Sequence, residues 1–258
     1  MDYLALADRI SLWLRSYLQN SGLRCFVVGV SGGIDSAVVS QLAAQTSLPV
    51  FVLNLPIHST SENSRLATLH CCALSRRFPN VSYREQDFTV AYDAFMQVAE
   101  SKETESEARG LAAANAKSRL RMMALYHVAA RNRGLVVGTG NKIEDFGVGF
   151  FTKYGDGGVD ISPIADLTKT QVRHLGQALG VSPEIIAAAP TDGLWEDDRN
   201  DEQQLGASYE ELEWAMSAEE QGWVPSNGRE REVLEIYRRF HRKNLHKMCE
   251  IPVFRLAD

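Results

Sequence analysis

The residues most capable of chemistry lie in one short stretch, Gly29–Ser36, which reads Gly-Val-Ser-Gly-Gly-Ile-Asp-Ser. It follows an apolar run typical of a buried strand and precedes a segment with helical spacing of apolar residues. A helix that starts directly after a strand presents backbone N–H groups without partners, and its dipole favours anions. Gly32 and Gly33 let the backbone approach a phosphate closely. We therefore predict a phosphate site here, with hydroxyl donors from Ser31 and Ser36.

Asp35 is the unusual residue of this stretch, because a carboxylate that faces a phosphate needs a cation between them. We predict that this cation is Mg²⁺, which prefers carboxylate oxygens. The alternative is an ordinary Ser/Gly turn in which Asp35 only caps a helix. Two other phosphate-binding patterns are excluded. No lysine follows the glycines as in the Gly-x4-Gly-Lys-Ser/Thr loop, and the Gly-x-Gly-x-x-Gly dinucleotide fingerprint is absent.

A second stretch rich in chemistry, 149–164, reads Gly-Phe-Phe-Thr-Lys-Tyr-Gly-Asp-Gly-Gly-Val-Asp-Ile-Ser-Pro-Ile. Four glycines, two acids and several aromatic rings in so short a span are not the pattern of a core segment. A hairpin with tight turns is one interpretation. The other is a binding site for a charged, ring-bearing ligand, contacted by Lys153 and Asp160.

Lys169 falls in the first turn of a predicted helix over 167–179, which Thr168 caps and Gly180 ends. A lysine is unfavourable at that end because the helix dipole is positive there. Its placement indicates an anionic partner for the ammonium group, with exposure to solvent as the alternative.

The elements that must position these residues alternate between strand and helix. Short apolar runs predict strands, and apolar residues three or four positions apart predict helices. The predicted strands are 25–28, 49–53, 81–84 and 135–137, and the predicted helices are 3–18, 35–44, 59–76, 111–131, 167–179, 208–216 and 229–245. Such an alternation favours a parallel sheet with right-handed crossovers. Ligands of such a sheet bind beyond the C-terminal ends of its strands, where Ser31 lies.

Two polar segments lack a strand or helix pattern. The charged run 100–109 is expected to be a solvated linker or helix end. The acidic run 189–202 is expected to be a surface loop that moves and closes over a ligand. After the last predicted helix, residues 246–248 are expected to begin a C-terminal tail.

The predicted helix 111–131 presents polar side chains on two different faces. Asn115 and Arg119 are one turn apart and share a face. Arg121 lies about 200° further round the helix, so the two arginines cannot serve the same site.

Length and composition are those of an ordinary globular chain, with 258 residues, 45% apolar and 23% charged. The net charge of −6 provides no basic field that would recruit nucleic acid. No apolar run reaches the roughly 18–20 residues that cross a bilayer, and the N-terminus is unlike a secretion signal. Four cysteines occur without a Cys-x-x-Cys pair. We therefore expect reduced thiols, used as buried apolar residues, in a cytoplasmic protein that binds neither nucleic acid nor membrane.

Taken together, these segments resemble NAD synthetase, a family of N-type ATP pyrophosphatases. The likeness runs from about residue 24 to residue 254 and rests on motifs that occur in the family's order. They are Ser-Gly-Gly-x-Asp-Ser (31–36), Asn-x-Lys-x-Arg-x-Arg-Met (115–122), Gly-Phe-Phe-Thr-Lys-Tyr-Gly-Asp-Gly-Gly-x-Asp (149–160), Leu-Thr-Lys-x-Gln-x-Arg (167–173), Pro-Thr (190–191) and His-Lys (246–247). The resemblance implies a single Rossmann-like α/β domain over residues 1–258, adenine nucleotide alpha hydrolase-like, with a parallel sheet flanked by helices.

The resemblance also implies an activity and the residues that serve it. The activity is a ligase reaction: ATP-dependent amidation of deamido-NAD by ammonia. The residues expected to bind ATP are Gly29, Ser31, Gly32, Gly33, Asp35, Ser36, Thr139, Lys169 and Thr191. Those expected to bind deamido-NAD are Arg119, Lys153, Asp160, His246 and Lys247. Asp35 and Glu144 are expected to hold Mg²⁺, and the family is a homodimer with the dinucleotide site at the subunit interface.

The chain departs from the family pattern in one loop. After Thr139, related enzymes commonly have Asp-His-Ala-Ala-Glu, where this chain has Gly-Asn-Lys-Ile-Glu (140–144), and one extra residue precedes Gly149. The acidic loop that follows Thr191 also has a different shape. The first departure bears on Glu144 as a metal ligand and on the delivery of ammonia.

The expected mechanism activates a carboxylate that ammonia alone does not attack at a useful rate. The nicotinate carboxylate attacks the α-phosphorus of ATP, pyrophosphate leaves into the loop 31–36, and ammonia then displaces AMP from the acyl-adenylate. Asp35 and Lys169 serve this chemistry by positioning and electrostatics. The chain has no room for a glutamine-hydrolysing domain, so direct use of ammonia is expected, and a separate amidase subunit as its source stays open.

Two alternative functions stay open at this point. One is another ATP pyrophosphatase ligase that acts on a different acceptor. The other is a non-catalytic nucleotide-binding sensor, which would not need the pairs Lys153/Asp160 and His246/Lys247.

Overall fold

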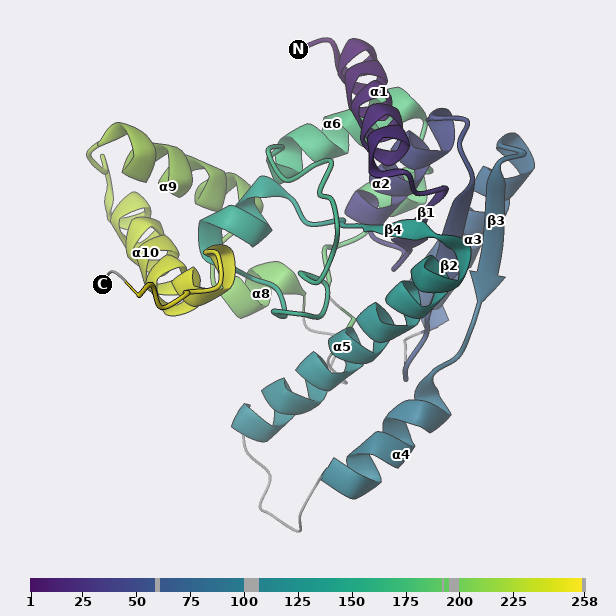
Figure 1. Ribbon diagram of the computed structural model, residues 1–258. Coiled ribbons are helices and arrows are strands. Elements are labelled where there is room, and N and C mark those ends of the chain that lie inside the picture. Colours follow the sequence, from purple (N-terminus) through teal and green to yellow (C-terminus); the bar gives the residue numbers. More distant parts are fainter. Residues whose placement is uncertain (59–60, 100–106, 192, 195–199, 257–258) are drawn as a thin grey trace.

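A parallel sheet lies at the centre of the computed structural model, which describes residues 1–256 apart from 59–60, 100–106, 192 and 195–199 (Figure 1). The strands are β1 (Cys25–Gly29), β2 (Val50–Asn54), β3 (Val81–Glu85) and β4 (Gly134–Val137). They form a four-stranded sheet in the order β3-β2-β1-β4. All neighbouring strands pair in parallel. Each predicted strand is confirmed with ends that shift by at most one residue.

Helices connect the strands, and one short π-helix follows the sheet. They are α1 (Tyr3–Ser21), α2 (Ile34–Gln45), α3 (Ser61–Arg77), α4 (Thr89–Ala99), α5 (Glu107–Asn132), the π-helix η1 (Ile143–Val148), α6 (Lys169–Leu179), α7 (Pro183–Ala187), α8 (Asp201–Leu205), α9 (Tyr209–Gln221) and α10 (Gly228–Met248). Among the described residues, no helix combines the length and the apolar character that spanning a membrane requires.

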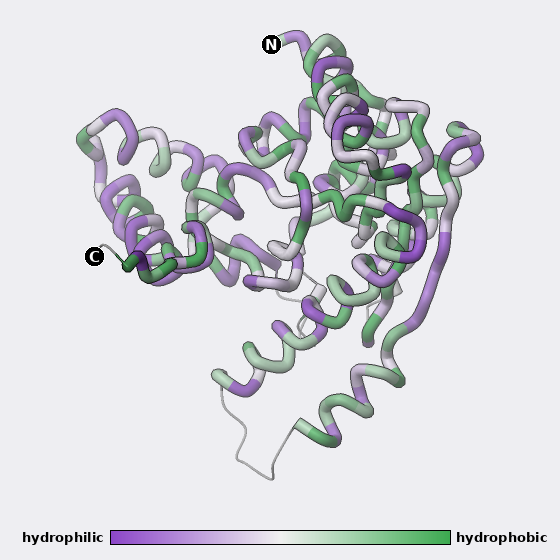
Figure 2. The backbone as a smooth tube through the Cα atoms, viewed as in Figure 1, coloured by the Kyte–Doolittle hydropathy of each residue, from purple (hydrophilic) through white to green (hydrophobic). Residues whose placement is uncertain are grey.

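Both faces of the sheet are covered, which explains why its inner strands are continuously apolar. Phe26 and Val28 point into a core built from α1, α2, α3 and α6. The residue between them, Val27, packs on the opposite face against Ala124 and Val128 of α5. This alternation is the ordinary consequence of the pleat. In Figure 2, the edge strand β3 is more hydrophilic than the strands beside it, in keeping with its mostly exposed or half-buried residues.

A separate hydrophobic cluster joins η1 to α9 and α10, which lie to one side of the sheet (Figure 1). Its buried residues include Ile143 of η1, Tyr209 and Leu212 of α9, and Tyr237 of α10. Because Ile143 is anchored there, the cluster fixes the backbone that carries Glu144.

Several expectations about secondary structure are wrong. Residues 149–164 do not form a hairpin, because Ile161 pairs in parallel with Val137 of β4 and the glycine-rich part folds into turns. His246 and Lys247 lie in the last turn of α10 rather than in a tail. The helices α4, η1, α7 and α8 were not predicted, since three of them are too short to show a period and α4 buries only Tyr92.

Some expectations fall partly outside the described residues. The run 100–109 is described only from residue 107, where α5 begins. The helix predicted from residue 59 is described from Ser61. Of the acidic run 189–202, residue 192 and residues 195–199 are not described, while 201–202 form the start of α8.

His70 of α3 gives a test of how α2 and α3 pack. The buried imidazole Nε2 lies 2.8 Å from the hydroxyl of Ser40 on α2. Burial lowers the pKa of His70 to about 4 from its ordinary value of 6.5. The unfolded chain therefore binds a proton that the folded chain rejects in this interval, so stability falls as the pH drops below about 6.5.

We expect His70→Gln, which stays neutral, to remove this dependence. Between pH 7.5 and pH 5 the wild type should lose about 2 kcal/mol more unfolding free energy than the variant. Urea unfolding at both pH values measures the difference. His174→Gln, at an exposed position of α6, is the matched control. Equal pH dependence of the wild type and His70→Gln would contradict the prediction.

Candidate active site

In the turn between β1 and α2, only one of the two glycines has a left-handed backbone, since Gly33 has φ −81°. Gly32 adopts φ +94°, and a β-carbon there would overlap the backbone carbonyl of Asn63 on α3. The hydroxyl of Ser36 accepts a hydrogen bond from the backbone N–H of Ser31 at 3.2 Å and donates one to the Gly33 carbonyl at 3.0 Å. Because the turn lies directly against α3, only glycine fits at position 32.

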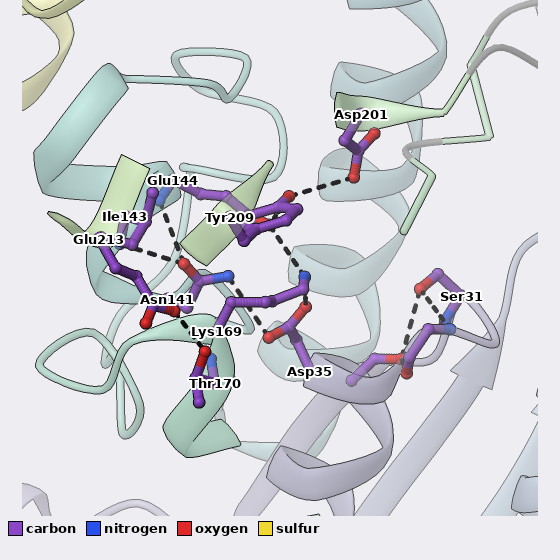
Figure 3. A network of polar contacts seen from close by, with 12 residues as sticks. Ser31, Asp35, Asn141, Ile143, Glu144, Lys169, Thr170, Asp201, Tyr209 and Glu213 are labelled. Carbon is purple, nitrogen blue, oxygen red and sulfur yellow. Dashed lines mark hydrogen bonds and ion pairs between the residues drawn. The ribbon is translucent and has the colours of Figure 1, made fainter. Parts of the chain in front are cut away.

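The centre of the site is a buried group of three charges, shown in Figure 3. The ammonium group of Lys169 donates to the carboxylate of Asp35 and, at 3.0 Å, to that of Glu144. The Lys169 side chain is only 4% exposed, and the two carboxyl side chains are 15% and 16% exposed. The anionic partner predicted for Lys169 therefore exists, and it lies within the chain itself.

The three groups shift one another's pKa values in the directions expected of a buried cluster. Burial opposes the charge on Lys169, but Asp35 and Glu144 outweigh it and raise the lysine pKa. Burial also raises the pKa of Asp35, and Lys169 reduces that shift only partly. For Glu144, burial is outweighed by Lys169 and by a hydrogen bond from Tyr209, so its pKa is lowered. The lysine therefore stays charged at neutral pH.

Helix α6 delivers Lys169 from its first turn. The Thr168 hydroxyl caps the helix, and Gln171 completes a capping box. The backbone N–H of Thr170 donates to Glu213 of α9 at 2.8 Å. Further along α6, Gly176 lies against Ile34 of α2, where a β-carbon would come within 2.6 Å of the isoleucine Cδ1. The close approach of α2 and α6 thus places Asp35 and Lys169, each in a first helical turn, beside each other.

Three polar residues that the sequence interpretation missed hold the cluster in place. Asn141 is fully buried. Its amide donates to Asp35 at 3.4 Å, while its oxygen accepts from the backbone N–H groups of Ile143 and Glu144. An asparagine directly before a helix is a capping signal, so this one was open to prediction.

Tyr209 and Asp201 come from much further along the chain. The Tyr209 hydroxyl lies 2.5 Å from Glu144 and 3.3 Å from Asp201 (Figure 3). The tyrosine ring is fully buried, and the Lys169 ammonium group lies 4.7 Å from its centre. Burial, reinforced by the charges of Glu144 and Asp201, raises the pKa of Tyr209, so the hydroxyl stays a proton donor. No local pattern points to these two residues.

Two cavities meet at this cluster. The smaller, of about 120 Å³, is lined by Asp35, Glu144, Asp145 and Lys169, and we call it the acidic cavity. The larger, of about 230 Å³, lies between the C-terminal ends of the strands and α5, and we call it the sheet-edge cavity. The residues that line both are Ser31, Thr139, Asp156 and Thr191. Gly29 lines only the sheet-edge cavity, and Gly33 and Ser36 line only the acidic one.

Four of the five residues expected to bind a dinucleotide lie together. Arg119 donates to the Lys153 carbonyl at 3.3 Å, and the Lys153 ammonium group donates to the His246 carbonyl at 2.7 Å. Lys247 donates to the Phe151 carbonyl at 2.7 Å. Burial lowers the pKa of Lys247. The end of α10 is thereby joined to α5 and to the glycine-rich segment.

Asp160, the fifth residue, has partners of a different kind. Its carboxylate accepts from the backbone N–H of Val136 on β4 at 2.7 Å and from the Tyr126 hydroxyl at 3.0 Å. Arg121 does not join Arg119, in line with the prediction from the helix geometry, and instead lines the sheet-edge cavity. Its guanidinium donates to the Leu55 carbonyl at 3.0 Å.

The donor set at the cluster suits a hard cation. Asp35 and Glu144 supply carboxylate oxygens, the ligands that Mg²⁺ prefers. In the described part of the chain, however, no group of three His, Cys, Asp or Glu side chains is arranged to hold a metal. The cation that the structure does place between the two carboxylates is the Lys169 ammonium group.

Tyr209→Phe tests whether the hydroxyl holds Glu144. The ring and its contact with Lys169 stay, but the hydrogen bond to a buried carboxylate is lost, so the unfolding free energy should fall by about 1–3 kcal/mol. Urea unfolding measures the change. Tyr17→Phe, on the exposed side of α1, is the control and should have little effect. Equal effects of both substitutions would refute the assignment.

Comparison with known proteins identifies the family of the chain. A family model described as NAD synthase matches residues 6–250. The NH(3)-dependent NAD(+) synthetase of Alkaliphilus metalliredigens is 36% identical over 258 residues, covering 98% of this chain and 99% of that relative. The structure of NMN synthetase from Francisella tularensis superposes with a TM-score of 0.85 at 32% identity, covering 98% of each chain. The NH3-dependent NAD synthetase of Campylobacter jejuni superposes with a TM-score of 0.77 at 25% identity, covering 99% of this chain and 100% of that one. The chain therefore belongs to the NAD synthase family.

Proposed function

We propose that this protein amidates deamido-NAD to NAD, using ATP and ammonia and releasing AMP and pyrophosphate. The observation that carries the proposal is the buried ammonium group of Lys169, held by Asp35 and Glu144 beside the Ser31–Ser36 turn. A fixed positive charge next to a phosphate-binding turn suits the stabilisation of a leaving pyrophosphate. Membership of the NAD synthase family counts against a sensor without catalysis.

The two cavities suggest how ATP lies. The triphosphate occupies the acidic cavity, beside Ser31, Gly32, Gly33 and Ser36. The nucleoside occupies the sheet-edge cavity, whose wall includes Gly29 and Val30 of the first strand and turn. Thr139 and Thr191 line both cavities and contact the phosphates between them.

Asp35 and Glu144 are the residues that would hold Mg²⁺. The ion would neutralise the charge of the triphosphate and polarise the phosphorus under attack. The chain's own contribution is to position the carboxylates of Asp35 and Glu144. Lys169 keeps them together, Asn141 orients Asp35, and Tyr209 orients Glu144.

Deamido-NAD is proposed to bind at the joint between α5, the glycine-rich segment and the end of α10. Arg119, Lys153, His246 and Lys247 supply positive or hydrogen-bonding groups there. Asp160 also belongs to this proposed site. Its bond to Val136 gives it a second task, which is to hold the segment against β4.

We also propose that the protein is a homodimer. Helices α4 and α5 project beyond the sheet in Figure 1. On α4, Val90, Phe95 and Val98 are 82%, 53% and 88% exposed. Apolar side chains gathered on projecting helices are typical of an interface. A second subunit would cover them.

A cytoplasmic location is proposed from the cysteines. All four are free, and Cys25 and Cys71 are buried as expected, whereas Cys249 is exposed. Burial raises the pKa of Cys71 to about 12 and also raises that of Cys25, so both stay unreactive thiols. Such thiols persist in a reducing compartment.

A second candidate substrate is nicotinate mononucleotide, which would yield NMN. The observation in its favour is that the NMN synthetase of Francisella tularensis superposes with a TM-score of 0.85, above the 0.77 of the Campylobacter NAD synthetase. The chemistry at the carboxylate is the same for both acceptors. They differ in the adenylate half, which only deamido-NAD carries.

Purified protein with ATP, MgCl₂ and ammonium chloride should convert deamido-NAD to NAD with one AMP per turnover. Nicotinate mononucleotide at equal concentration should react with a lower kcat/KM. Chromatographic detection of both products decides between the acceptors. A preference for the mononucleotide would establish the second candidate, and failure with both would refute the amidation.

Two substitutions separate the ATP site from the acceptor site. Asp35→Asn should reduce pyrophosphate release by about a hundredfold or more, because the cluster loses a charge that positions Lys169. Lys153→Met should raise the KM for deamido-NAD about tenfold and leave the KM for ATP unchanged. A pyrophosphate assay with each substrate varied in turn measures both. If the two variants changed both KM values equally, the division of the sites would be wrong.

Val98→Asp tests the homodimer. A charge at a buried interface should shift the protein from dimer to monomer in analytical ultracentrifugation, with the unfolding free energy of the monomer little changed. Val224→Asp is the control, because Val224 is 86% exposed and lies between α9 and α10. A wild type that sediments as a monomer would contradict the proposal.

A further inference from the structure

Arg173 belongs to a motif of the sequence that the proposed reaction uses only in part. The motif 167–173 contributes Lys169 to the site, and Arg173 follows it one helical turn later on α6. Residues four positions apart lie on the same face of a helix. Both side chains line the acidic cavity. Arg173 is therefore placed to contact a ligand that fills this cavity.

Helix α6 contacts the start of α2 on both sides of Arg173. Before it, Lys169 donates to Asp35, and after it, Gly176 packs against Ile34. The first turn of α2 lines the same cavity, and the backbone N–H groups of a first helical turn have no helical partners. The Lys169 side chain is 4% exposed and that of Arg173 is 28% exposed, so Arg173 lies nearer to the opening.

The two cations of the cavity differ in how firmly they are paired. The charge of Lys169 is shared by two buried carboxylates, those of Asp35 and Glu144. Arg173 instead donates from Nη1 to Glu210 of α9 at 2.8 Å, and the Glu210 side chain is 60% exposed. Exposed ion pairs add little to stability, because water competes for both charges. The guanidinium can therefore exchange Glu210 for another anion with little loss of stability.

The position of Arg173 selects the part of ATP that it meets. Thr139 and Thr191 line both cavities, whereas Arg173 lines only the acidic one. With the nucleoside in the sheet-edge cavity, the phosphates farthest from the ribose lie on the side of Arg173. A guanidinium offers a planar fork of N–H donors that matches two phosphate oxygens.

We propose that Arg173 binds the β- and γ-phosphates of ATP, the pair that leaves as pyrophosphate. The guanidinium exchanges Glu210 for these phosphates when ATP enters the acidic cavity. This inference rests on the proposed function for the orientation of ATP, with its nucleoside in the sheet-edge cavity. Arg173 thereby gives the leaving group a positive charge that is not already shared between two carboxylates, as the charge of Lys169 is.

Arg173→Gln removes the charge and keeps a polar side chain. Calorimetry without deamido-NAD should give a Kd for MgATP about tenfold above that of the wild type, the effect of losing a charge-assisted hydrogen bond. The Kd for AMP, which lacks the two outer phosphates, should not change. Arg173→Lys keeps the charge without the planar fork and should have an intermediate Kd for MgATP. An unchanged Kd for MgATP, or equal weakening of MgATP and AMP, would overturn the proposal.

Glu210→Gln breaks the same ion pair from its other side. It should keep or lower the Kd for MgATP, because the guanidinium is then free for the phosphates. If the pair only braced α6 against α9, Arg173→Gln and Glu210→Gln would weaken MgATP binding equally, and the role of Arg173 would be refuted. Arg229→Gln is the matched control, since Arg229 holds Glu211 of α9 at 2.7 Å and does not line either cavity.

Binding without an acceptor keeps this test separate from the proposed function. A protein that made no amide but bound MgATP through Arg173 would lose the proposed function and keep this phosphate contact. An active enzyme whose affinity for MgATP survived Arg173→Gln would keep the function and lose the contact. In the full reaction, Arg173→Gln should raise the KM for ATP and leave the KM for deamido-NAD unchanged. A rise confined to the KM for deamido-NAD would contradict the assignment.

Discussion

The rest of the site depends on one buried ammonium group shared by two carboxylates. Charges taken out of water are costly unless each is paired and hydrogen-bonded. Lys169, Asp35 and Glu144 come from three separate elements, so the chain must bring α6, α2 and η1 together before any of the three is stable. The cluster therefore acts as a constraint on the fold as well as a part of the chemistry.

Two different cores satisfy this constraint. The core around β1, β2, α2 and α6 places Asp35 and Lys169. The smaller cluster of η1, α9 and α10 places Glu144 and supplies the Tyr209 hydroxyl. The site lies where the two cores adjoin, and the hydrogen bond from Thr170 to Glu213 connects them at the start of α6. The hydrophobic packing and the electrostatics thus reinforce each other.

Local patterns in the sequence were sufficient for the strands and the phosphate-binding turn. The apolar runs before Ser31 and after Pro49 have few alternatives to a buried strand, and Gly32 needs the positive φ that it adopts. The capping signals at Thr168 and Gly180 located α6 correctly. Family resemblance brought in Glu144, His246 and Lys247, whose roles no local pattern indicates.

What local patterns could not reveal depends on contacts between distant segments. Tyr209 meets Glu144 across 65 positions of the sequence, and Asp201 joins through α8, which is too short to show a helical period. The glycine-rich segment was open to a hairpin interpretation because its strand partner, Val137, lies before it and runs parallel to it. Asp145 went unnoticed for a similar reason, since only the three-dimensional structure shows that Gly140 leaves space for it.

The contact between Gly176 and Ile34 has a consequence for how this protein tolerates change. It lies about 10 Å along α6 from Lys169. Yet the distance between the axes of α2 and α6 at that point determines the separation of Asp35 and Lys169 in their first turns. A single added methyl group would act there as a wedge. Substitution of Gly176 is therefore restricted by the ion pair between Lys169 and Asp35, although Gly176 contacts neither residue of the pair.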